Sequence, residues 1–412
     1  MDNIIWFKKD GKTVLLNRNN MKFVRVNNEM LKDKKMLSDI LEEKYDFFSA
    51  QEGIKRKKLY YTMTRKCNLN CSFCANESSP VIDTKDDMSI ETLREYVIPK
   101  LIKMKFKEVI LSGGEPFIKE DFREILQLFC NAFGAEHIGL QSNGLLIDEE
   151  KAEFIRNKVG FVELSIENVV ETDDLQCKME AIFSLLKSKH IEIVFSYVVT
   201  NENKGLIRKA FDLAVKYKAI LQLKFVAPVG RALKNKIEID ERDILNEYLE
   251  MINYVIEKKY FFDELRGIFF PSVSARRACG ALGDIIAMQS NGDLYMCPNL
   301  KGSDYYYGNI VSEEFEEIQK KIENKIHNNN SHKEFWVDER KMCEDCEVKF
   351  FCTGACRAEI NKCKDYEERL CTVNRLFYKF ILFEYDRKSD MESNIYKLKK
   401  YIEAFTDEER AK

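Results

Sequence analysis

Short apolar runs alternate with amphipathic segments between about residues 58 and 225. A run of four to eight apolar residues indicates a buried strand, and apolar residues three or four positions apart indicate a helix. The runs predict six strands, at 59–63, 108–111, 138–141, 161–165, 191–199 and 221–225. The amphipathic segments predict helices between them, at 90–104, 122–129, 149–156, 179–186 and 206–217. This alternation predicts an α/β domain of parallel strands, and six strands rather than eight favour an open, partial (β/α)6 barrel.

The first 54 residues have a different pattern. Residues 12–16 and 22–26 are predicted to be two strands, and the polar run Asn17-Arg18-Asn19-Asn20 between them favours a turn. Apolar residues recur at helical spacing over 36–45. Two strands and one helix bury too little surface to fold alone. We therefore expect a small N-terminal α+β unit that packs on the rest of the chain.

Two further stretches are predicted to be helical, at 233–262 and at 376–405, and a cysteine-rich segment lies between them. We therefore divide the chain into five parts. They are the N-terminal unit (1–54), the barrel (55–232), a helical bridge (233–278), the cysteine-rich domain (279–375) and a C-terminal helix (376–412).

Polar or glycine-rich clusters follow five of the six predicted strands. In order, they are the segment 66–74, Gly113-Gly114-Glu115-Pro116, Ser142-Asn143-Gly144, Ser165-Ile166-Glu167-Asn168 and Pro228-Val229-Gly230-Arg231. In parallel barrels the chemistry gathers at the carboxyl ends of the strands. We therefore expect these clusters to form a single site on one rim.

The first cluster contains three cysteines, Cys67, Cys71 and Cys74, with Phe73 directly before the third. Structural zinc is held by four ligands, and an ordinary 4Fe–4S cluster is also held by four cysteines. Three ligands therefore indicate a cluster with one iron open to a group that is not protein. A zinc site, or cysteines that only fill the core, is the alternative.

Composition narrows the function classes. The chain has 412 residues, a net charge of −3 and a pI near 6.1, so it has no electrostatic footprint for nucleic acid. We find no secretory signal pattern and no apolar run long enough to span a membrane. Thirteen cysteines in such a chain indicate metal-binding or catalytic thiols rather than disulfides. These features predict a cytoplasmic protein without a nucleic-acid or membrane partner.

The motif Cys67-x-x-x-Cys71-x-Phe73-Cys74 resembles the signature of radical S-adenosylmethionine (radical SAM) enzymes. The resemblance implies a partial barrel and a 4Fe–4S cluster. It also implies that the open iron binds the amino and carboxylate groups of S-adenosyl-L-methionine (SAM). One electron then cleaves the sulfonium to give a 5′-deoxyadenosyl radical.

Residues of three of the other clusters take expected roles beside this resemblance. Gly113-Gly114-Glu115-Pro116 resembles the family's motif that meets the methionine amino group. Its glycines let the backbone come close, and Glu115 offers a carboxylate near a cation. Ser142, Asn143 and Ser165 are candidates for hydrogen bonds to ribose or to the methionine carboxylate.

The remaining residues of the rim are less specific. Phe73 suits stacking or backbone contact with adenine, and its alternative role is apolar packing. Arg231 lies in a run common in relatives, and it is expected either to contact a ligand or to form a structural ion pair. Family members often carry an Asp-Gly pair near Glu167-Asn168, and this chain departs there. We therefore assign no role to those two residues.

The cysteine-rich domain contains Cys279, Cys297, Cys343, Cys346, Cys352, Cys356, Cys363 and Cys371. Taken alone, a Cys-x-x-Cys pair with two more cysteines usually suggests zinc. Behind a radical SAM core, however, the order resembles the SPASM extension, which carries auxiliary 4Fe–4S clusters. The resemblance implies one cluster on Cys343, Cys346, Cys352 and Cys371, with Cys363 as the alternative to Cys371. It implies a second cluster on Cys279, Cys297 and Cys356, whose remaining iron binds substrate or a ligand other than cysteine.

These resemblances imply a radical SAM/SPASM maturase that oxidatively modifies or crosslinks a ribosomally made peptide, with a thioether as one product. The N-terminal unit resembles a reduced version of the peptide-recognition unit of such enzymes, which pairs a strand edge with a leader segment. Flavodoxin or ferredoxin is the type of electron donor implied. One alternative is an anaerobic sulfatase-maturing enzyme, which oxidises Cys or Ser to formylglycine. A zinc-binding interaction protein on a degenerate barrel is the non-enzyme alternative.

Overall fold

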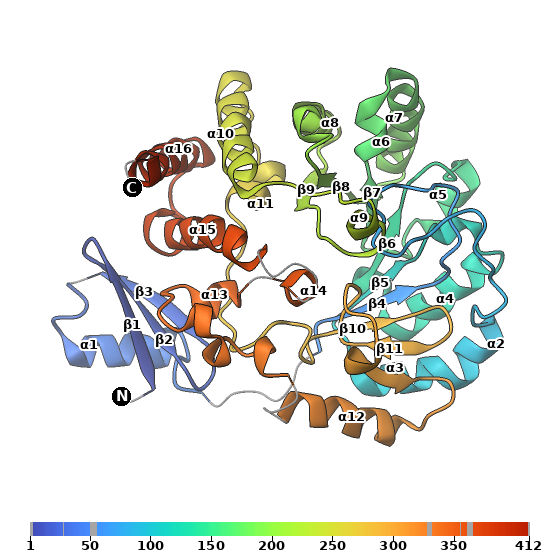
Figure 1. Ribbon diagram of the computed structural model, residues 1–412, viewed down its shortest axis with the longest axis horizontal. Coiled ribbons are helices and arrows are strands. Elements are labelled where there is room, and N and C mark those ends of the chain that lie inside the picture. Colours follow the sequence, from blue (N-terminus) through green and yellow to red (C-terminus); the bar gives the residue numbers. More distant parts are fainter. Residues whose placement is uncertain are drawn as a thin grey trace.

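The computed structural model describes residues 3–27, 29–49, 56–327, 332–354, 356–360 and 366–410 (Figure 1). A sheet of nine strands forms the centre, in the order β12-β11-β10-β4-β5-β6-β7-β8-β9. None of the helices within these ranges has the length and apolar character needed to cross a lipid bilayer.

Six consecutive strands of this sheet are parallel, and each pairs with the next strand along the chain. They are β4 (Lys58–Thr62), β5 (Glu108–Ser112), β6 (Ile138–Ser142), β7 (Phe161–Ser165), β8 (Ile193–Val199) and β9 (Ile220–Phe225). Figure 1 shows them as a curved fan with helices on the outer side. The prediction of an open barrel of six parallel strands is therefore confirmed.

The helices between these strands lie close to their predicted positions. They are α2 (Ile90–Thr92), α3 (Ile98–Met104), α4 (Phe122–Phe133), α5 (Glu149–Ile155), α6 (Glu167–Glu171), α7 (Asp173–Ser188) and α8 (Ile207–Tyr217). In α4 the buried residues are Phe122, Ile125, Leu126 and Phe129. Their spacing places them on one face, which explains why the apolar pattern located this helix.

The sheet continues past β4 into the cysteine-rich domain. β10 (Ile285–Met288) lies parallel to β4, and β11 (Asp293–Tyr295) and β12 (Tyr306–Asn309) follow as antiparallel strands. The apolar pattern of the sequence did not predict these strands. They are only three or four residues long, too short for a clear apolar pattern. The barrel and the cysteine-rich domain therefore share one sheet.

The N-terminal unit has three strands rather than the two predicted. They are β1 (Ile4–Lys9), β2 (Lys12–Asn17) and β3 (Phe23–Asn27), and α1 (Lys34–Asp39) follows. β2, β3 and the helix were predicted. β1 was missed although its first four residues, Ile4-Ile5-Trp6-Phe7, form a short apolar run.

One face of this small sheet packs on the helical segment that begins with α1, and the other packs on the cysteine-rich domain. Leu15, Val24 and Val26 form a buried cluster with Leu37 and Leu41. On the opposite face, the rings of Phe7 and Phe23 lie 5.9 and 5.0 Å from that of Phe351. Phe351 belongs to α13 (Lys349–Cys352). Figure 1 shows the N-terminal sheet beside this helix.

The other helices are α9 (Gly230–Lys234), α10 (Glu241–Lys258), α11 (Arg266–Phe269), α12 (Phe315–His327), α14 (Arg357–Ile360), α15 (Tyr366–Lys379) and α16 (Met391–Arg410). The helix predicted at 376–405 is interrupted between α15 and α16. The buried side chain of Asn394 binds both the N–H and the carbonyl of Asp386, at 3.0 and 2.8 Å. These two hydrogen bonds hold the turn that separates the helices.

Candidate functional site

A cavity of about 390 Å³ lies at the carboxyl ends of the barrel strands. Its walls carry most of the residues predicted for the rim, namely Cys67, Phe73, Cys71, Cys74, Gly113, Gly114, Ser142, Asn143, Ser165 and Arg231. Glu115 and Pro116 lie behind this wall, where both are buried. The structure thus brings the five clusters together at one place.

The three cysteines of the loop are arranged to act together. The thiol of Cys67 accepts a hydrogen bond from the Leu69 N–H at 3.4 Å, and that of Cys74 accepts one from the Ser78 N–H at 3.4 Å. Burial raises the pKa of the Cys71 thiol to about 11, and the nearby Cys74 adds to this. Such a thiol stays protonated near neutral pH unless a metal displaces its proton. N–H groups that point at sulfur also suit cluster ligands, so this donor set fits the three-cysteine cluster.

Gly113 and Gly114 allow two strand ends to lie against each other. A Cβ on Gly113 would lie 2.5 Å from the Thr64 carbonyl oxygen, and one on Gly114 would lie 2.2 Å from that of Lys66. At this point the Gly114 N–H donates to Thr64 at 2.7 Å. The glycines therefore fix the end of β5 against the segment that leads into Cys67, and a side chain at either position would push the two apart.

Glu115 organises the wall from behind. It is fully buried, and its carboxylate accepts hydrogen bonds from the Ser142 hydroxyl at 2.8 Å and from the Asn143 N–H at 2.9 Å. Burial raises its pKa to about 7, although these bonds and one from the Phe117 N–H act in the opposite direction. The side chain of Asn143 in turn donates to Asn68 at 2.8 Å. Glu115 thus holds the ends of β5 and β6 in register beside the cysteine loop.

Arg231 braces the cysteine loop. Its guanidinium donates to the Cys71 carbonyl at 2.8 Å and to the Ser78 carbonyl at 2.7 Å, and its N–H donates to the Cys74 carbonyl at 3.0 Å. The preceding Gly230 has a φ of +56°, and a Cβ there would lie 2.6 Å from the Cys74 carbonyl oxygen. Among the described residues Arg231 forms these bonds to main-chain carbonyls rather than the ion pair that the sequence offered as one role. Its side chain also lines the cavity, so the ligand contact stays a prediction.

Two residues that the sequence left without a role also belong to the cavity. Glu167 lines it, is almost fully buried, and accepts a hydrogen bond from the Val198 N–H at 2.7 Å. Burial raises its pKa to about 7. The side chain of Asn168 hydrogen-bonds to Cys71. Because Glu167 and Asn168 follow β7, their position alone could have predicted that they belong to the cavity, although these two residues depart from the family's pattern.

A charged pair inside the cavity gave no signal in the sequence. Glu163 on β7 and Lys224 on β9 lie 2.5 Å apart, and both line the cavity. Asn235 was missed as well, and its side chain donates to the Ser72 carbonyl at 2.8 Å. Such contacts depend on which strands and loops are neighbours, so spacing along the chain does not reveal them.

The cysteines of the second domain form two groups. Cys297 interacts electrostatically with Cys279 and Cys356, and Cys352 does so with Cys371, Cys346 and Cys343. Burial raises the pKa of Cys297 and of Cys352 to about 12. The SPASM resemblance predicts one cluster on each group, and this assignment stays a prediction. Cys363, its alternative to Cys371, lies outside the described residues.

Arg357 lies between these groups and was not predicted. It is 1% exposed and interacts electrostatically with Cys279 and Cys356 of one group and with Cys343 of the other. Within the part of the chain that the structure describes, no three His, Cys, Asp or Glu side chains form a group suited to a single metal ion. Cysteines that bind different irons of one cluster need not converge on one ion.

Comparisons with known proteins agree with these features. Residues 61–214 match the family model of the Radical SAM superfamily. The chain is 25% identical over 273 residues to mycofactocin maturase MftC of Mycolicibacterium smegmatis, which covers 62% of this chain and 67% of that protein. It is 24% identical over 375 residues to a cysteine-type anaerobic sulfatase-maturating enzyme of Clostridium perfringens, which covers 80% of this chain and 96% of that enzyme.

Solved structures share the fold. SuiB of Streptococcus suis bound to S-adenosylmethionine superposes with a TM-score of 0.56 at 14% identity, over 88% of this chain and 96% of that one. Native anSMEcpe with bound AdoMet and the Cp18Cys peptide superposes with a TM-score of 0.56 at 20% identity, over 79% of this chain and 96% of that one. Because each match covers more than three quarters of this chain, it extends well beyond the barrel.

Proposed function

We propose, from the premise that this chain is a radical SAM enzyme, that it matures a ribosomally made peptide by oxidative modification or crosslinking, with a thioether as one product. One observation carries the proposal: Cys67, Cys71 and Cys74 line one cavity with the glycine and serine clusters of the neighbouring strands. When bound by these cysteines, a 4Fe–4S cluster with SAM would supply the radical chemistry that removes a hydrogen atom from the substrate. The surrounding residues bind the substrate, orient it and exclude water.

Each part of the cavity takes a defined role in this proposal. Cys67, Cys71 and Cys74 hold three irons of the cluster. Phe73, Gly113, Gly114, Ser142, Asn143, Ser165 and Arg231 form the wall against which SAM lies. Glu115 acts through Ser142 and Asn143, whose positions it fixes. Arg231 keeps the cysteine loop in shape through the carbonyls of Cys71 and Ser78.

The second domain holds two auxiliary clusters in this proposal. One is bound by Cys343, Cys346, Cys352 and Cys371, and the other by Cys279, Cys297 and Cys356. The mutual interactions of these thiols support the two sets. These clusters would accept electrons from the reaction or anchor the substrate, and the iron without a cysteine would bind the substrate or a ligand other than cysteine. A flavodoxin- or ferredoxin-type protein would be the electron donor.

The N-terminal sheet is proposed to bind a leader segment of the peptide. Among the described residues, β1 and β3 each pair with β2 alone, so each has an edge with unpaired main-chain groups. Such an edge accepts an extended peptide as an added strand. The sheet packs on α13 through Phe351, so a leader bound there lies beside the auxiliary-cluster domain.

The proposal is tested by analysing iron, sulfide and zinc in protein reconstituted without oxygen, and by measuring 5′-deoxyadenosine after addition of SAM and dithionite. We expect about 12 iron per chain, as for three four-iron clusters, and 5′-deoxyadenosine formation. The control is the Cys130→Ala, Cys177→Ala double variant, whose cysteines belong to neither domain's ligand sets and which should keep all the iron. Zinc without iron would contradict the proposal.

A second candidate is the formylglycine-generating reaction of sulfatase maturation. The C. perfringens sulfatase-maturating enzyme supports it, because the alignment covers 96% of that enzyme. Peptides derived from sulfatases, with Cys or Ser at the modified position, distinguish the two candidates. Formylglycine in these peptides, detected by mass spectrometry, would favour the second candidate. A modified short precursor peptide encoded beside this gene would favour the first.

A further inference from the structure

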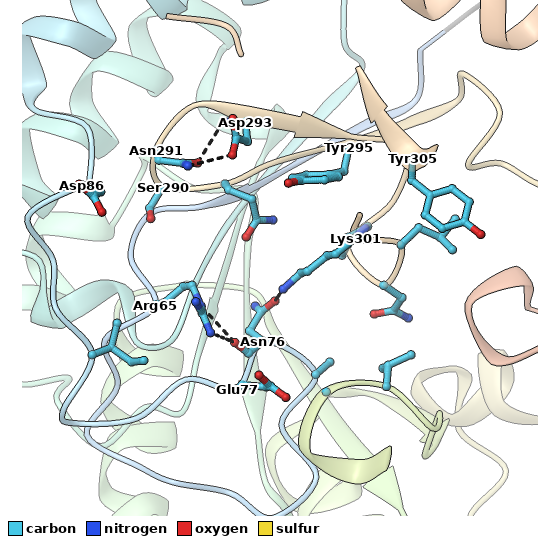
Figure 2. Close-up of a pocket in the computed structure, with 18 of the residues that line it drawn as sticks. Arg65, Asn76, Glu77, Asp86, Ser290, Asn291, Asp293, Tyr295, Lys301 and Tyr305 are labelled. Atoms are coloured by element: carbon cyan, nitrogen blue, oxygen red, sulfur yellow. Dashed lines mark hydrogen bonds between the residues drawn. The ribbon is translucent and has the colours of Figure 1, made fainter. Parts of the chain in front are cut away.

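A second cavity, of about 530 Å³, lies next to the cavity of the three barrel cysteines. One wall is formed by residues of the segment 75–87, which follows Cys74, and the other by the β10–β11 hairpin and the loop after Cys297 (Figure 2). Ala75, Val229 and Asn299 line both cavities. A ligand in the second cavity therefore lies directly beside the proposed site of chemistry.

Carboxylates outnumber cations in this second cavity. Its lining has two cations, Arg65 and Lys301, and five carboxylates, Glu77, Asp83, Asp86, Asp87 and Asp293. Two carboxylates are paired with cations outside the lining, since Glu77 lies 2.6 Å from Lys234 and Asp83 lies 3.5 Å from Lys85. The remaining lining is still acidic, and it favours a positively charged ligand.

The charges are also separated within the cavity. Both cations bind Asn76: Arg65 donates to its main-chain carbonyl at 3.1 Å, and Lys301 reaches across to its side-chain oxygen at 3.1 Å (Figure 2). On the hairpin, Asp293 accepts hydrogen bonds from neutral donors, among them Asn291 at 2.9 Å. Asp86 is exposed on the facing segment. The negative charge is therefore concentrated away from Asn76, between the hairpin and Asp86.

Two polar groups of the lining point to a ligand as well. Ser290 is 9% exposed, and within the described chain its hydroxyl forms no hydrogen bond, so it is open to the cavity. The Oδ2 atom of Asp87 is buried and has no hydrogen-bond partner among the described residues, although such atoms normally have one. Together with the carboxylates, these groups can bind both the charge and the N–H groups of a basic side chain.

We propose that this second cavity binds a lysine or arginine side chain of the peptide substrate, close in sequence to the residue that is modified. The inference rests on the proposed function and adds the substrate class. The basic group lies between Asp86 and Asp293, and Ser290 accepts one of its hydrogen bonds. The adjoining residue of the peptide then extends past Ala75 and Asn299 into the cysteine cavity.

Selection of random 12-residue peptides displayed on phage tests the proposal, with the full chain reconstituted with iron and sulfide as the target. The wild-type protein should enrich Lys and Arg about twofold over the starting library. The Asp86→Asn, Asp293→Asn double variant should lose this enrichment. The strongest wild-type peptide, labelled with fluorescein, should bind the double variant about tenfold more weakly in an anisotropy titration. The matched control is Asp173→Asn, an exposed carboxylate on α7, which should bind like wild type.

Because Asp293 also holds the hairpin through its hydrogen bonds, Asp86→Asn alone provides a second variant, with about threefold weaker binding expected. Equal binding by wild type and both variants, or no basic enrichment by wild type, would overturn the inference. The proposed function is judged separately, by 5′-deoxyadenosine formation in wild-type protein without any peptide. If that reaction occurs and the enrichment does not, the cavity inference alone fails.

Discussion

The two cysteine-bearing regions are built in opposite ways. Cys67, Cys71 and Cys74 come from one short loop, and main-chain contacts from Gly114 and Arg231 hold that loop in place. The cysteines of the second domain come from segments spread over 279–371, and their neighbours include the core residues Phe350 and Phe351. The first site therefore depends on the conformation of a loop, whereas the second depends on the folding of a domain. Variants in the first region should lose activity with little change in stability, whereas variants in the second region should also lose stability.

The largest effect is expected from Cys71→Ala. The substitution removes one of three ligands that the loop provides, so about four iron per chain should be lost. Formation of 5′-deoxyadenosine should fall at least a thousandfold, while thermal unfolding shifts little because the loop lies on the rim. Unchanged iron and activity would show that this loop holds no cluster.

Cys352→Ala should give the opposite balance. About four iron should again be lost, and peptide modification should disappear. Formation of 5′-deoxyadenosine without peptide should fall less than tenfold. The melting temperature should drop by about 5 °C, because a metal bound only by the folded state stabilises it. If Cys352→Ala keeps the wild-type melting temperature, the second region does not depend on domain folding more than the first does.

Glu115→Gln should change how the stability of the protein depends on pH. The pKa of Glu115 is raised by burial from 4.5 to about 7, so the folded state holds the proton more tightly than the unfolded state does. Its contribution to stability is full below pH 4.5 and is lost as pH rises through 7. Between pH 4.5 and 8, wild type should lose up to about 3 kcal/mol relative to the variant.

Melting curves of both proteins across this range measure the difference. Glu150→Gln, at an exposed carboxylate on α5, is the control and should follow wild type. Parallel curves for Glu115→Gln and wild type would show that Glu115 does not change its proton affinity on folding.

The smallest effect is expected from Arg231→Met. The substitution removes two hydrogen bonds to the carbonyls of Cys71 and Ser78 and keeps much of the apolar stem. About 1–2 kcal/mol of stability should be lost, and cluster reconstitution should slow several-fold. Arg156→Met, which removes an exposed ion pair with Glu153, is the matched control and should leave both quantities unchanged. Equal reconstitution rates in the two variants would show that the loop does not need this brace.

The sequence was sufficient for the six barrel strands because parallel strands buried on both faces are continuous apolar runs. It was also sufficient to bring the rim clusters together, since each follows a strand. It did not reveal β10, β11 and β12, which are too short for a clear apolar pattern. The pairing of β10 with β4 also joins segments more than 200 residues apart. The roles of Glu115 and Arg231 also needed the fold. Glu115 lies buried behind the cavity wall, and Arg231 binds main-chain carbonyls, which a sequence motif does not reveal.

The pairing of β10 with β4 has a consequence for how this protein can be divided. Residues 285–288 cover the edge of the strand that leads into Cys67. A shortened protein that ended before residue 279 would expose this edge, whose unpaired amides and carbonyls would recruit strands from other molecules. The barrel is therefore not a module that can be cut out or exchanged at its apparent boundary. Recombination that replaces the C-terminal half must supply a strand of matching register, so the two halves are constrained to be inherited as a unit.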